Sequence, residues 1–430
     1  MKKSYPSQQE QKELQERKLK LLIDRLYNKS TYYRNLFKQN LIDPQSIQTL
    51  EDLQKIPTTD KDQLQANNWD FLCVDKNEIV EYTSTSGSLG NPVIIALTEK
   101  DLKRLALNEY FSYQEMDANS SDIFQLALTL DKQFMAGMAY YQGCNMLGAA
   151  AIRTGPGNPS MQWDNIQNLG TQVIVVVPSF LLKLIDYAKK NGIDYRKSSL
   201  KKAICIGEGI RDAEFQWNTL GKRIHELWPE LQVYSTYAST EMQTAFTECS
   251  QGNGGHLHYE LLIAEVLDDY GKVLPFGQIG ELVITTLDVE GMPLLRYRTG
   301  DLCYLTNKKC NCGRESLRIS PIIGRKKQMI KFKGTTLFPP LIFDTLNQIP
   351  YIEDYLVILT DNDIYTDELE VAVSCKDSFH KKEAIAQIEV FLQSKLKVRP
   401  KVRLETLDWI QKRQKIGIGR KLSKLLDLRE

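Results

Sequence analysis

The chain contains 430 residues, of which 42% are hydrophobic and 25% are charged, a composition typical of an ordinary globular protein. Its 55 basic residues nearly balance its 54 acidic residues, so no net field favours binding to nucleic acid or to an anionic membrane. The length exceeds what one hydrophobic core usually organises, so we expect two or more domains.

The first residues have no apolar stretch like that of a signal peptide, and no run of 18 apolar residues occurs in the chain. We therefore expect a cytoplasmic protein without a membrane segment. Residues 10–27 place apolar side chains at helical spacing, which predicts a helix whose inner face is Leu14, Leu21, Leu22 and Leu26.

Residues 82–92 read Tyr-Thr-Ser-Thr-Ser-Gly-Ser-Leu-Gly-Asn-Pro, a loop rich in hydroxyl groups and glycine. Gly87 and Gly90 allow a tight turn and a close approach to a ligand. Around them, Thr85, Ser86 and Ser88 supply short hydroxyl donors, which suit phosphate oxygens. Most loops of this composition are simple turns, so this pattern needs further motifs to support a phosphate site.

Strand-like runs then alternate with helical ones, which indicates an α/β core with a parallel sheet. The elements expected in this part are a capped helix from Thr98, strands at 171–177, 203–206 and 232–235, and a helix at 214–227. Shorter strands follow and predict a β-rich subdomain, at 261–267, 281–285 and 302–305. The last unit is expected to contain strands at 355–360, 369–374 and 402–404 and a helix at 382–396.

Three further motifs follow the hydroxyl-rich loop in order along the chain. They are Tyr-Ala-Ser-Thr-Glu at 237–241, Tyr-Arg-Thr-Gly-Asp at 297–301, and Gly-Arg at 324–325 ahead of Met-Ile-Lys-Phe-Lys-Gly at 329–334. Together the four resemble the adenylate-forming (acyl-AMP) enzyme superfamily, and within it the phenylacetate–coenzyme A ligase family. The resemblance extends from about residue 15 to the C-terminus. It implies a large N-terminal α/β domain with a β-rich subdomain, which binds ATP and the acid (residues 1–324), and a small mobile C-terminal α+β domain (residues 325–430).

The function that this resemblance implies is ATP-dependent ligation of an aryl or related carboxylic acid to coenzyme A, through an acyl-AMP. Transfer of the acid to a carrier-protein phosphopantetheine is the alternative, because both acceptors bring a thiol and phosphate. A non-catalytic nucleotide-binding relative is a third possibility of another class. Its chemistry would not require Glu241, Asp301 and Arg325 together, which argues against it.

The resemblance assigns the catalytic carboxylate and part of the nucleotide site to residues 237–241. Glu241 would bind the magnesium ion that bridges phosphate oxygens, since Mg²⁺ prefers carboxylate ligands. Thr240 would reach the α-phosphate, and Tyr237 would lie near the adenine. The plain alternative for Ser-Thr-Glu is the N-terminal cap of a helix.

Other nucleotide contacts are assigned in the same way. Asp301 would accept hydrogen bonds from both ribose hydroxyls, and Arg325 would meet ribose or phosphate oxygens at the domain junction. Gly207 and Glu208 would form the turn beside the adenine. For Asp301 the plain alternative is an aspartate of a turn beside Gly300.

The catalytic lysine of the family lies near the C-terminus, where this chain has Lys415, Lys421 and Lys424. Counting back from the end favours Lys421, and a solvated basic tail is the plain alternative. The phosphate loop also departs from the family, because Asn91 replaces a common lysine and Leu89 a common threonine. Without a positive charge at this position, ATP would bind more weakly, or magnesium would have to neutralise more of the phosphate charge.

Four residues suggest a structural zinc site: Cys249, His256, Cys310 and Cys312. Thiolate and imidazole ligands favour tetrahedral zinc, and members of the ligase branch with similar Cys and His patterns carry one. His258 is a rival to His256. The other cysteines are expected to be packing residues: Cys73, Cys144, Cys205, Cys303 and Cys375.

The acid pocket is assigned by resemblance to Phe134, Tyr141 and Pro178. Aromatic side chains there suit an apolar pocket for a ring or alkyl chain, and they suit an ordinary core equally. The sequence therefore leaves open which acid is bound, and it also leaves open whether the protein forms a homodimer.

Overall fold

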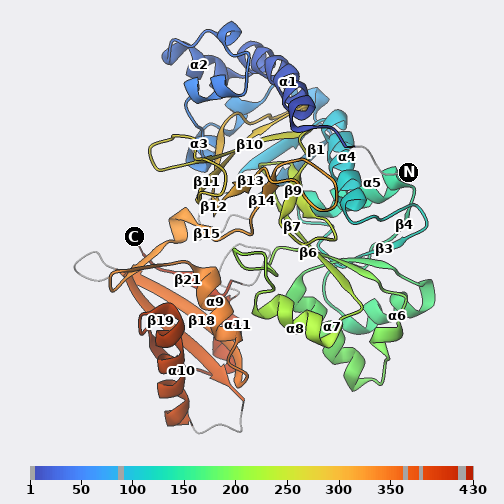
Figure 1. The fold of residues 1–430 in the computed structure, drawn as a ribbon, viewed down its shortest axis with the longest axis vertical. Coiled ribbons are helices and arrows are strands. Elements are labelled where there is room, and N and C mark those ends of the chain that lie inside the picture. The colour runs from blue at the N-terminus through green and yellow to red at the C-terminus, as the bar shows by residue number, and fades with distance from the viewer. Residues whose placement is uncertain (1–4, 86–91, 362–366, 377–380, 415–422, 430) are drawn as a thin grey trace.

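The structure is a computed structural model that describes residues 5–85, 92–361, 367–376, 381–414 and 423–429. Figure 1 shows a large blue-to-yellow body and a smaller orange-to-red body, joined through β15 (Gly324–Arg325) and the 3-10 turn η6 (Lys326–Gln328). We call residues 5–323 the N-terminal lobe and residues 330–429 the C-terminal lobe. Each has buried core residues of its own.

The helices of the N-terminal lobe are α1 (Gln8–Lys29), α2 (Thr31–Gln39), α3 (Lys61–Ala66), α4 (Glu99–Glu115), α5 (Met135–Leu147), α6 (Pro159–Leu169), α7 (Pro178–Lys190) and α8 (Thr219–Leu227). Its strands are β1 (Glu81–Ser84), β2 (Ile94–Leu97), β3 (Ile123–Leu126), β4 (Ala150–Ile152), β5 (Val173–Val176), β6 (Lys202–Ile206), β7 (Gln232–Ser239), β8 (Thr244–Glu248), β9 (Gly255–Leu257), β10 (Leu262–Leu267), β11 (Gly280–Thr286), β12 (Tyr297–Cys303), β13 (Leu305–Thr306) and β14 (Arg318–Ile319). Further 3-10 turns lie at Pro44–Ser46, Glu51–Lys55, Asn68–Phe71, Lys76–Glu78 and Tyr195–Lys197.

The predicted N-terminal helix is confirmed, but its inner face is partly wrong. α1 begins after Ser7, whose side chain forms a capping box with Glu10. Leu22 and Leu26 are buried as expected, whereas Leu21 is 71% exposed. The buried stripe continues instead through Leu19 and two glutamines, because Gln15 donates to the buried carbonyl oxygen of Leu262 and so replaces an apolar contact with a hydrogen bond.

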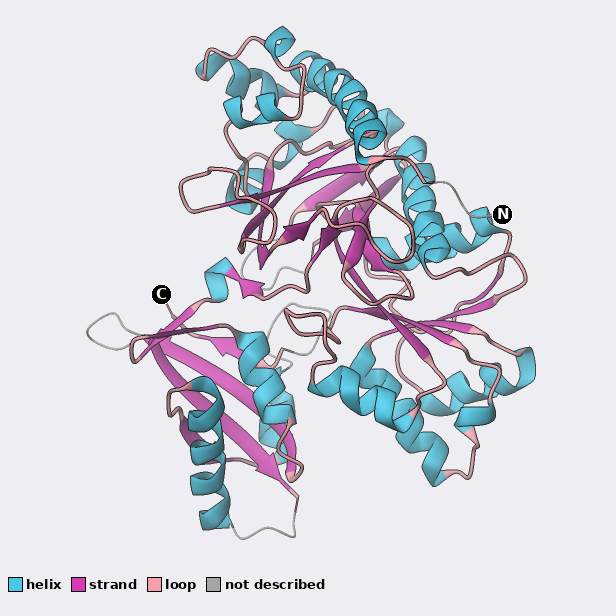
Figure 2. Ribbon diagram, viewed as in Figure 1, coloured by secondary structure: helices cyan, strands magenta, loops and turns pink. Residues whose placement is uncertain are grey.

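The central sheet has nine strands in the order β13-β14-β9-β8-β7-β6-β5-β3-β4. Neighbours from β4 to β7 are parallel, and pairs from β7 onward are antiparallel. β5 is buried on both faces: Ile174 and Val176 pack with helices α6 to α8, and Val173 and Val175 pack with α4 and α5. Figure 2 shows helices flanking this sheet. The predicted parallel α/β core is therefore confirmed.

The β-rich part is a second sheet in the order β10-β11-β12-β15, with antiparallel pairs. The last pair places Asp301 of β12 opposite Arg325 of β15.

The helix predicted for residues 214–227 was too long, because the chain becomes helical only at Thr219. Phe215 has φ +64° and a bridge joins Arg211 to Trp217, so a tight hairpin precedes α8.

The C-terminal lobe contains α9 (Pro339–Asn347), α10 (Lys381–Leu396), α11 (Leu407–Gln414), β16 (Ile330–Phe332), β17 (Thr335–Leu337), β18 (Ile352–Asp361), β19 (Asp367–Cys375), β20 (Lys401–Leu404) and β21 (Leu425–Asp427). Its main sheet has the order β20-β19-β18-β21. The predicted strands and helix of this unit are confirmed, within a few residues at each end. Among the described residues, no helix is long and apolar enough to cross a membrane.

Candidate functional site

Three of the predicted nucleotide residues meet at the junction of the two lobes. Asp301 of β12 is buried, and its carboxylate accepts from the Tyr237 hydroxyl at 2.6 Å and from Arg325 Nε at 3.0 Å. Burial and the negative charge of Asp301 raise the pKa of Tyr237 well above its ordinary value, so this phenol remains a hydrogen-bond donor. Asp301 lies within a strand, which rules out the simple turn alternative. We call Tyr237, Glu241, Asp301 and Arg325 the junction site.

The predicted magnesium ligand lies at the end of the strand that carries Tyr237. β7 ends at Ser239, and residues 240–243 form a turn into β8, with Gln243 at φ +50°. No helix begins here, so the capping alternative for Ser-Thr-Glu is wrong. Glu241 is mostly buried, with 13% of its side chain exposed, and its carboxylate lies 3.9 Å from Lys61 Nζ.

Lys61 is a candidate that the sequence analysis missed. It is the first residue of α3, which is capped by Asp60. Thr59 N–H donates to the carbonyl oxygen of Arg296, and this pairing holds the start of α3 beside β12. No local pattern around Lys61 signals this position, because it depends on a contact between segments about 240 residues apart in the sequence.

The base of the phosphate loop is described, but most of the loop is not. Thr85 and Val93 exchange two hydrogen bonds: the Val93 N–H donates to Thr85 Oγ1, and the Thr85 N–H donates to the Val93 carbonyl. These bonds close the two ends of the loop next to the β1–β2 pair. The predicted phosphate contacts Ser86, Gly87, Ser88 and Gly90 lie outside the described residues, together with Leu89 and Asn91.

The turn that was assigned to the adenine lies at the end of β6. Gly207 has φ +78°, a conformation that favours glycine. The Glu208 carboxylate accepts from the Ser179 N–H at 2.8 Å and from its hydroxyl at 3.0 Å. Glu208 thus satisfies a free backbone donor at the start of α7.

Of the three candidate lysines near the C-terminus, only Lys424 lies within the described residues; Lys415 and Lys421 do not. Lys424 Nζ lies 4.1 Å from the ring centroid of Tyr355 and 4.0 Å from the Asp354 carboxylate. Burial lowers the pKa of Lys424. Its ammonium group is thus engaged with Tyr355 and Asp354, and it also lies within the electrostatic reach of Glu208 in the N-terminal lobe.

The residues assigned to the acid pocket lie on the central sheet and its helices. Phe134 precedes α5, and Tyr141 lies in α5 with Arg153 above its ring; both are half-buried at the edge of one core cluster. Pro178 is buried as the first residue of α7. A separate cavity of about 130 Å³ lies elsewhere, where Phe111 and Arg314 are among its lining residues. It is not part of the junction site.

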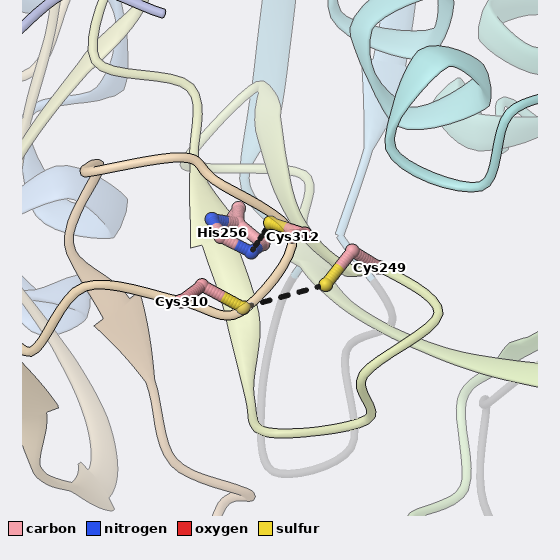
Figure 3. A group of neighbouring side chains, drawn as sticks. All are labelled: Cys249, His256, Cys310 and Cys312. Carbon is pink, nitrogen blue, oxygen red and sulfur yellow. Dashed lines mark hydrogen bonds between the residues drawn. The ribbon is translucent and has the colours of Figure 1, made fainter. Parts of the chain in front are cut away.

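The four predicted zinc ligands come together, as Figure 3 shows. Their ligand atoms all lie within 4.8 Å of one another, and we call Cys249, His256, Cys310 and Cys312 the cysteine cluster. The Cys249 and Cys310 sulfur atoms are 3.7 Å apart, and Cys312 Sγ is 3.6 Å from His256 Nε2. The rival His258 lies apart from this set, with its Nδ1 2.8 Å from Asn108 Oδ1.

Neighbouring groups orient the cysteine cluster. His256 Nδ1 lies 2.9 Å from Ser316 Oγ, which leaves Nε2 directed at the cysteines. Gly313, at φ +96°, donates its N–H to the Cys310 carbonyl and forms a tight turn within the segment that carries Cys310 and Cys312. Arg314 pairs with the buried Glu115 at 2.9 Å. The donor set is three sulfur atoms and one imidazole nitrogen, on two segments that the cluster joins.

Comparison with known proteins identifies the family. A family model described as AMP-binding enzyme matches residues 4–289, and one described as AMP-binding enzyme C-terminal domain matches residues 334–429. The phenylacetate-coenzyme A ligase of Thermus thermophilus is 31% identical over 373 residues, which cover 85% of this chain and 82% of that protein. The protein of the same name from Escherichia coli is 26% identical over 371 residues, with 85% and 82% covered.

Solved structures agree on the fold. 2-Hydroxyisobutyryl-CoA ligase in its postadenylation state, with 2-HIB-AMP, matches with a TM-score of 0.85 at 23% identity over 98% of this chain and 90% of that one. In its thioesterification state, with 2-HIB-AMP and CoA, the TM-score is 0.70 at 24% identity, with 98% and 91% covered. The family models and the relatives match most of the chain, and the fold agrees with them. The chain therefore belongs to the AMP-binding enzyme family, in its phenylacetate–coenzyme A ligase branch.

Proposed function

We propose that the protein is an ATP-dependent acid–coenzyme A ligase that activates a carboxylic acid as its acyl-AMP. The observation that carries this proposal is the junction site, where Asp301 accepts from Tyr237 and Arg325 and where the Glu241 carboxylate acts electrostatically on Arg325. A carboxylate is a poor electrophile, and adenylation supplies it with a leaving group. The acid oxygen attacks the α-phosphorus and expels pyrophosphate; the thiol then attacks the acyl carbon and expels AMP.

The junction site has the groups that a nucleotide requires. Each carboxylate oxygen of Asp301 accepts one donor in the structure and can accept a second. The two oxygens could therefore also accept from the two ribose hydroxyls. Arg325, which is exposed on its outer side, would meet ribose or phosphate oxygens. Glu241 would hold magnesium, which neutralises phosphate charge when bound. Thr240 would reach the α-phosphate, and Gly207 and Glu208 would lie near the adenine.

We propose that Lys61 supplies the positive charge that the phosphate loop lacks. The loop has Asn91 where the family commonly has lysine. Lys61 Nζ lies beside Glu241, and 41% of its side chain remains exposed to a ligand. A phosphate group bound at Glu241 through magnesium would therefore lie within reach of a second cation. In this proposal Thr85 fixes the loop base, and Ser86, Gly87, Ser88 and Gly90 enclose the phosphates.

The C-terminal lobe would move between the two half-reactions by turning at η6. Lys421 would then contact the carboxylate and α-phosphate during adenylation, and a different face would receive coenzyme A. The higher TM-score with the postadenylation state than with the thioesterification state supports an arrangement of the lobes close to adenylation. Few residues suffice to absorb such a rotation.

The cysteine cluster would hold a structural zinc ion. Three thiols and one imidazole lie close enough to share one ion, and Ser316 orients the histidine. The set provides four protein ligands and no free position, which is the pattern of a structural site. Bound zinc would crosslink the segment after β8 to the segment after β13.

The acid is proposed to be an aryl or related carboxylic acid, bound near Phe134, Tyr141 and Pro178. The names of the relatives from Thermus thermophilus and Escherichia coli support phenylacetate as the first acid to test. Coenzyme A is the proposed acceptor, since those relatives carry it in their names.

The test is pyrophosphate release from ATP with magnesium across aryl and alkyl acids, with and without coenzyme A. The proposal expects acid-dependent release that turns over many times only when coenzyme A is present. Release that stays at a single turnover with coenzyme A would point to a carrier-protein thiol as acceptor. No release with any acid would contradict the ligase function.

A further inference from the structure

Two hydrogen bonds between Thr219 and Asp344 join the lobes away from η6. The N–H of Thr219, the first residue of α8, donates at 2.8 Å to the carboxylate of Asp344 in α9. The Thr219 hydroxyl also lies 3.4 Å from the Asp344 carbonyl oxygen. Asp344 is half-buried, while its neighbours Ile342 and Leu346 face the core of the C-terminal lobe. One carboxylate oxygen therefore bonds the other lobe, while the second accepts from Gln348 of its own lobe at 3.3 Å.

The bond from the Thr219 N–H to Asp344 satisfies a backbone donor that α8 leaves free. The helix cap, Asn218, accepts from the Gly221 N–H at 2.9 Å, so the first-turn donor of Thr219 needs another acceptor. A carboxylate at this end also interacts favourably with the partial positive charge of the helix N-terminus. Asp344 thus caps a helix of the opposite lobe, and the cap exists only while the lobes keep this arrangement.

The capped helix end is tied to the turn assigned to the adenine. The side-chain amide of Asn218 donates to the carbonyl oxygen of Gly209 at 2.9 Å, two residues after Gly207. Gly207 and Glu208 belong to the same turn. Asp344 therefore contacts the N-terminal lobe next to a predicted nucleotide-binding segment, rather than at a remote surface.

Another contact across the junction is weaker. Lys327 pairs with Asp62 at 2.7 Å, but both side chains are about 70% exposed, and such ion pairs contribute little. Lys327 also belongs to η6, where a rotation of the C-terminal lobe moves atoms least. The Asp344 contact lies farther along the lobe, so it changes more with the lobe arrangement.

We propose that Asp344 is a positioning residue that holds the C-terminal lobe in the arrangement for adenylation, and so sets the balance between the two half-reactions. This inference rests on the proposed ligase function. The arrangement that contains the bond matches the postadenylation state of 2-hydroxyisobutyryl-CoA ligase better than its thioesterification state. A bond present in one arrangement and broken in the other shifts their populations by its own strength, about five-fold for one ordinary hydrogen bond.

Two substitutions remove the bond from opposite sides. Asp344→Ala deletes the acceptor and keeps a good helix former within α9. Thr219→Pro deletes the N–H donor at the first helical position, where proline is well tolerated, and it also removes the hydroxyl that donates to the Asp344 carbonyl oxygen. Asn218 has φ −70° and ψ 178°, the extended conformation that a residue before proline prefers. Asp408→Ala is the matched control, because Asp408 is an exposed aspartate that pairs with Lys412 inside α11.

The two half-reactions are measured separately. Acid-dependent exchange of labelled pyrophosphate into ATP reports adenylation, and thioester formation from prepared acyl-adenylate and coenzyme A reports the second step. We expect the ratio of adenylation to thioester formation to fall about five-fold in each single variant. The double variant should match Thr219→Pro, because that change already removes both Thr219 donors to Asp344. Asp408→Ala should leave the ratio unchanged.

Parallel loss of both half-reactions at a constant ratio would overturn the inference, since that is the effect of a purely structural role. Additive effects in the double variant would overturn it as well. If the unchanged protein shows no acid-dependent exchange, the proposed function fails, and the inference that rests on it fails too. Active unchanged protein with an unaltered ratio in both variants contradicts only the role of Asp344.

Discussion

The junction site and the cysteine cluster lie at opposite ends of one strand, and their surroundings differ. Glu241 lies just before β8, and Cys249 lies just after it; five residues of strand span about 17 Å. At the junction site, Arg325 is exposed and Lys61 is half-exposed, so ligands have access. In the cysteine cluster, Cys249, His256 and Cys310 are buried.

This difference in exposure matches the two proposed roles, which are substrate binding at the junction site and structural support at the cysteine cluster. The groups proposed to bind and release substrates are partly exposed at the boundary between the lobes, where the proposed movement of the C-terminal lobe would give access. In the zinc proposal, the cysteine cluster would supply all four ligands from protein and would fix the far end of the strand that leads to Glu241. We therefore expect substitutions at the junction site to lower activity without lowering stability, and substitutions in the cluster to do the reverse.

The largest effect is expected for Asp301→Ala. It removes the only proposed acceptor of both ribose hydroxyls, so acid-dependent pyrophosphate exchange should fall about 10³-fold. The midpoint of thermal unfolding should stay within a few degrees of the unchanged protein. If activity instead falls only in proportion to the loss of folded protein, Asp301 stabilises the fold and does not bind the ribose.

Lys421→Ala is expected to act on one half-reaction. Adenylation should fall about 100-fold, because a cation that stabilises charge at the α-phosphate is lost. Thioester formation from prepared acyl-adenylate should be retained. Full adenylation in this variant would move the role to Lys415; Lys424 is less suited, because it is engaged with Tyr355.

Cys310→Ala tests the structural role of the cysteine cluster. Loss of one ligand should remove bound zinc and lower the unfolding midpoint by about 5–10 °C. The matched control is Cys375→Ala, which removes a half-buried cysteine of the C-terminal lobe outside the cluster. Protein purified without chelator that contains no zinc would contradict the zinc proposal, whatever the stability of the variant.

Lys61→Met should have the smallest effect. The Michaelis constant for ATP should rise about tenfold, since one charge-assisted contact to phosphate is lost. Adding Asn91→Lys should restore much of that affinity by supplying the lysine that the loop lacks. Lys100→Met is the control, because Lys100 pairs with Glu290 away from the junction site. An unchanged Michaelis constant in Lys61→Met would remove Lys61 from the site.

Local patterns predicted the strands and most helices, since burial on both faces of β5 and the capping box of α4 are visible in the sequence. Leu21 was misplaced because hydrogen-bonded glutamines share the buried face of α1. The proximity of Asp301, Tyr237 and Arg325 came only from the family resemblance. The contacts of Lys61 with Glu241 and of Thr219 with Asp344 join segments more than 100 residues apart in the sequence. Local sequence patterns therefore cannot predict them.

Isotope transfer from the acid distinguishes an acyl-AMP intermediate from other routes to the thioester. The protein is given ATP, magnesium, coenzyme A and phenylacetate with ¹⁸O in its carboxylate, and the products are analysed by mass spectrometry. The account predicts that AMP carries one ¹⁸O, because the acid oxygen that attacks the α-phosphorus leaves with AMP when the thiol attacks the acyl carbon. Product thioester formed with ¹⁸O in inorganic phosphate and none in AMP would contradict it, since that outcome requires an acyl phosphate.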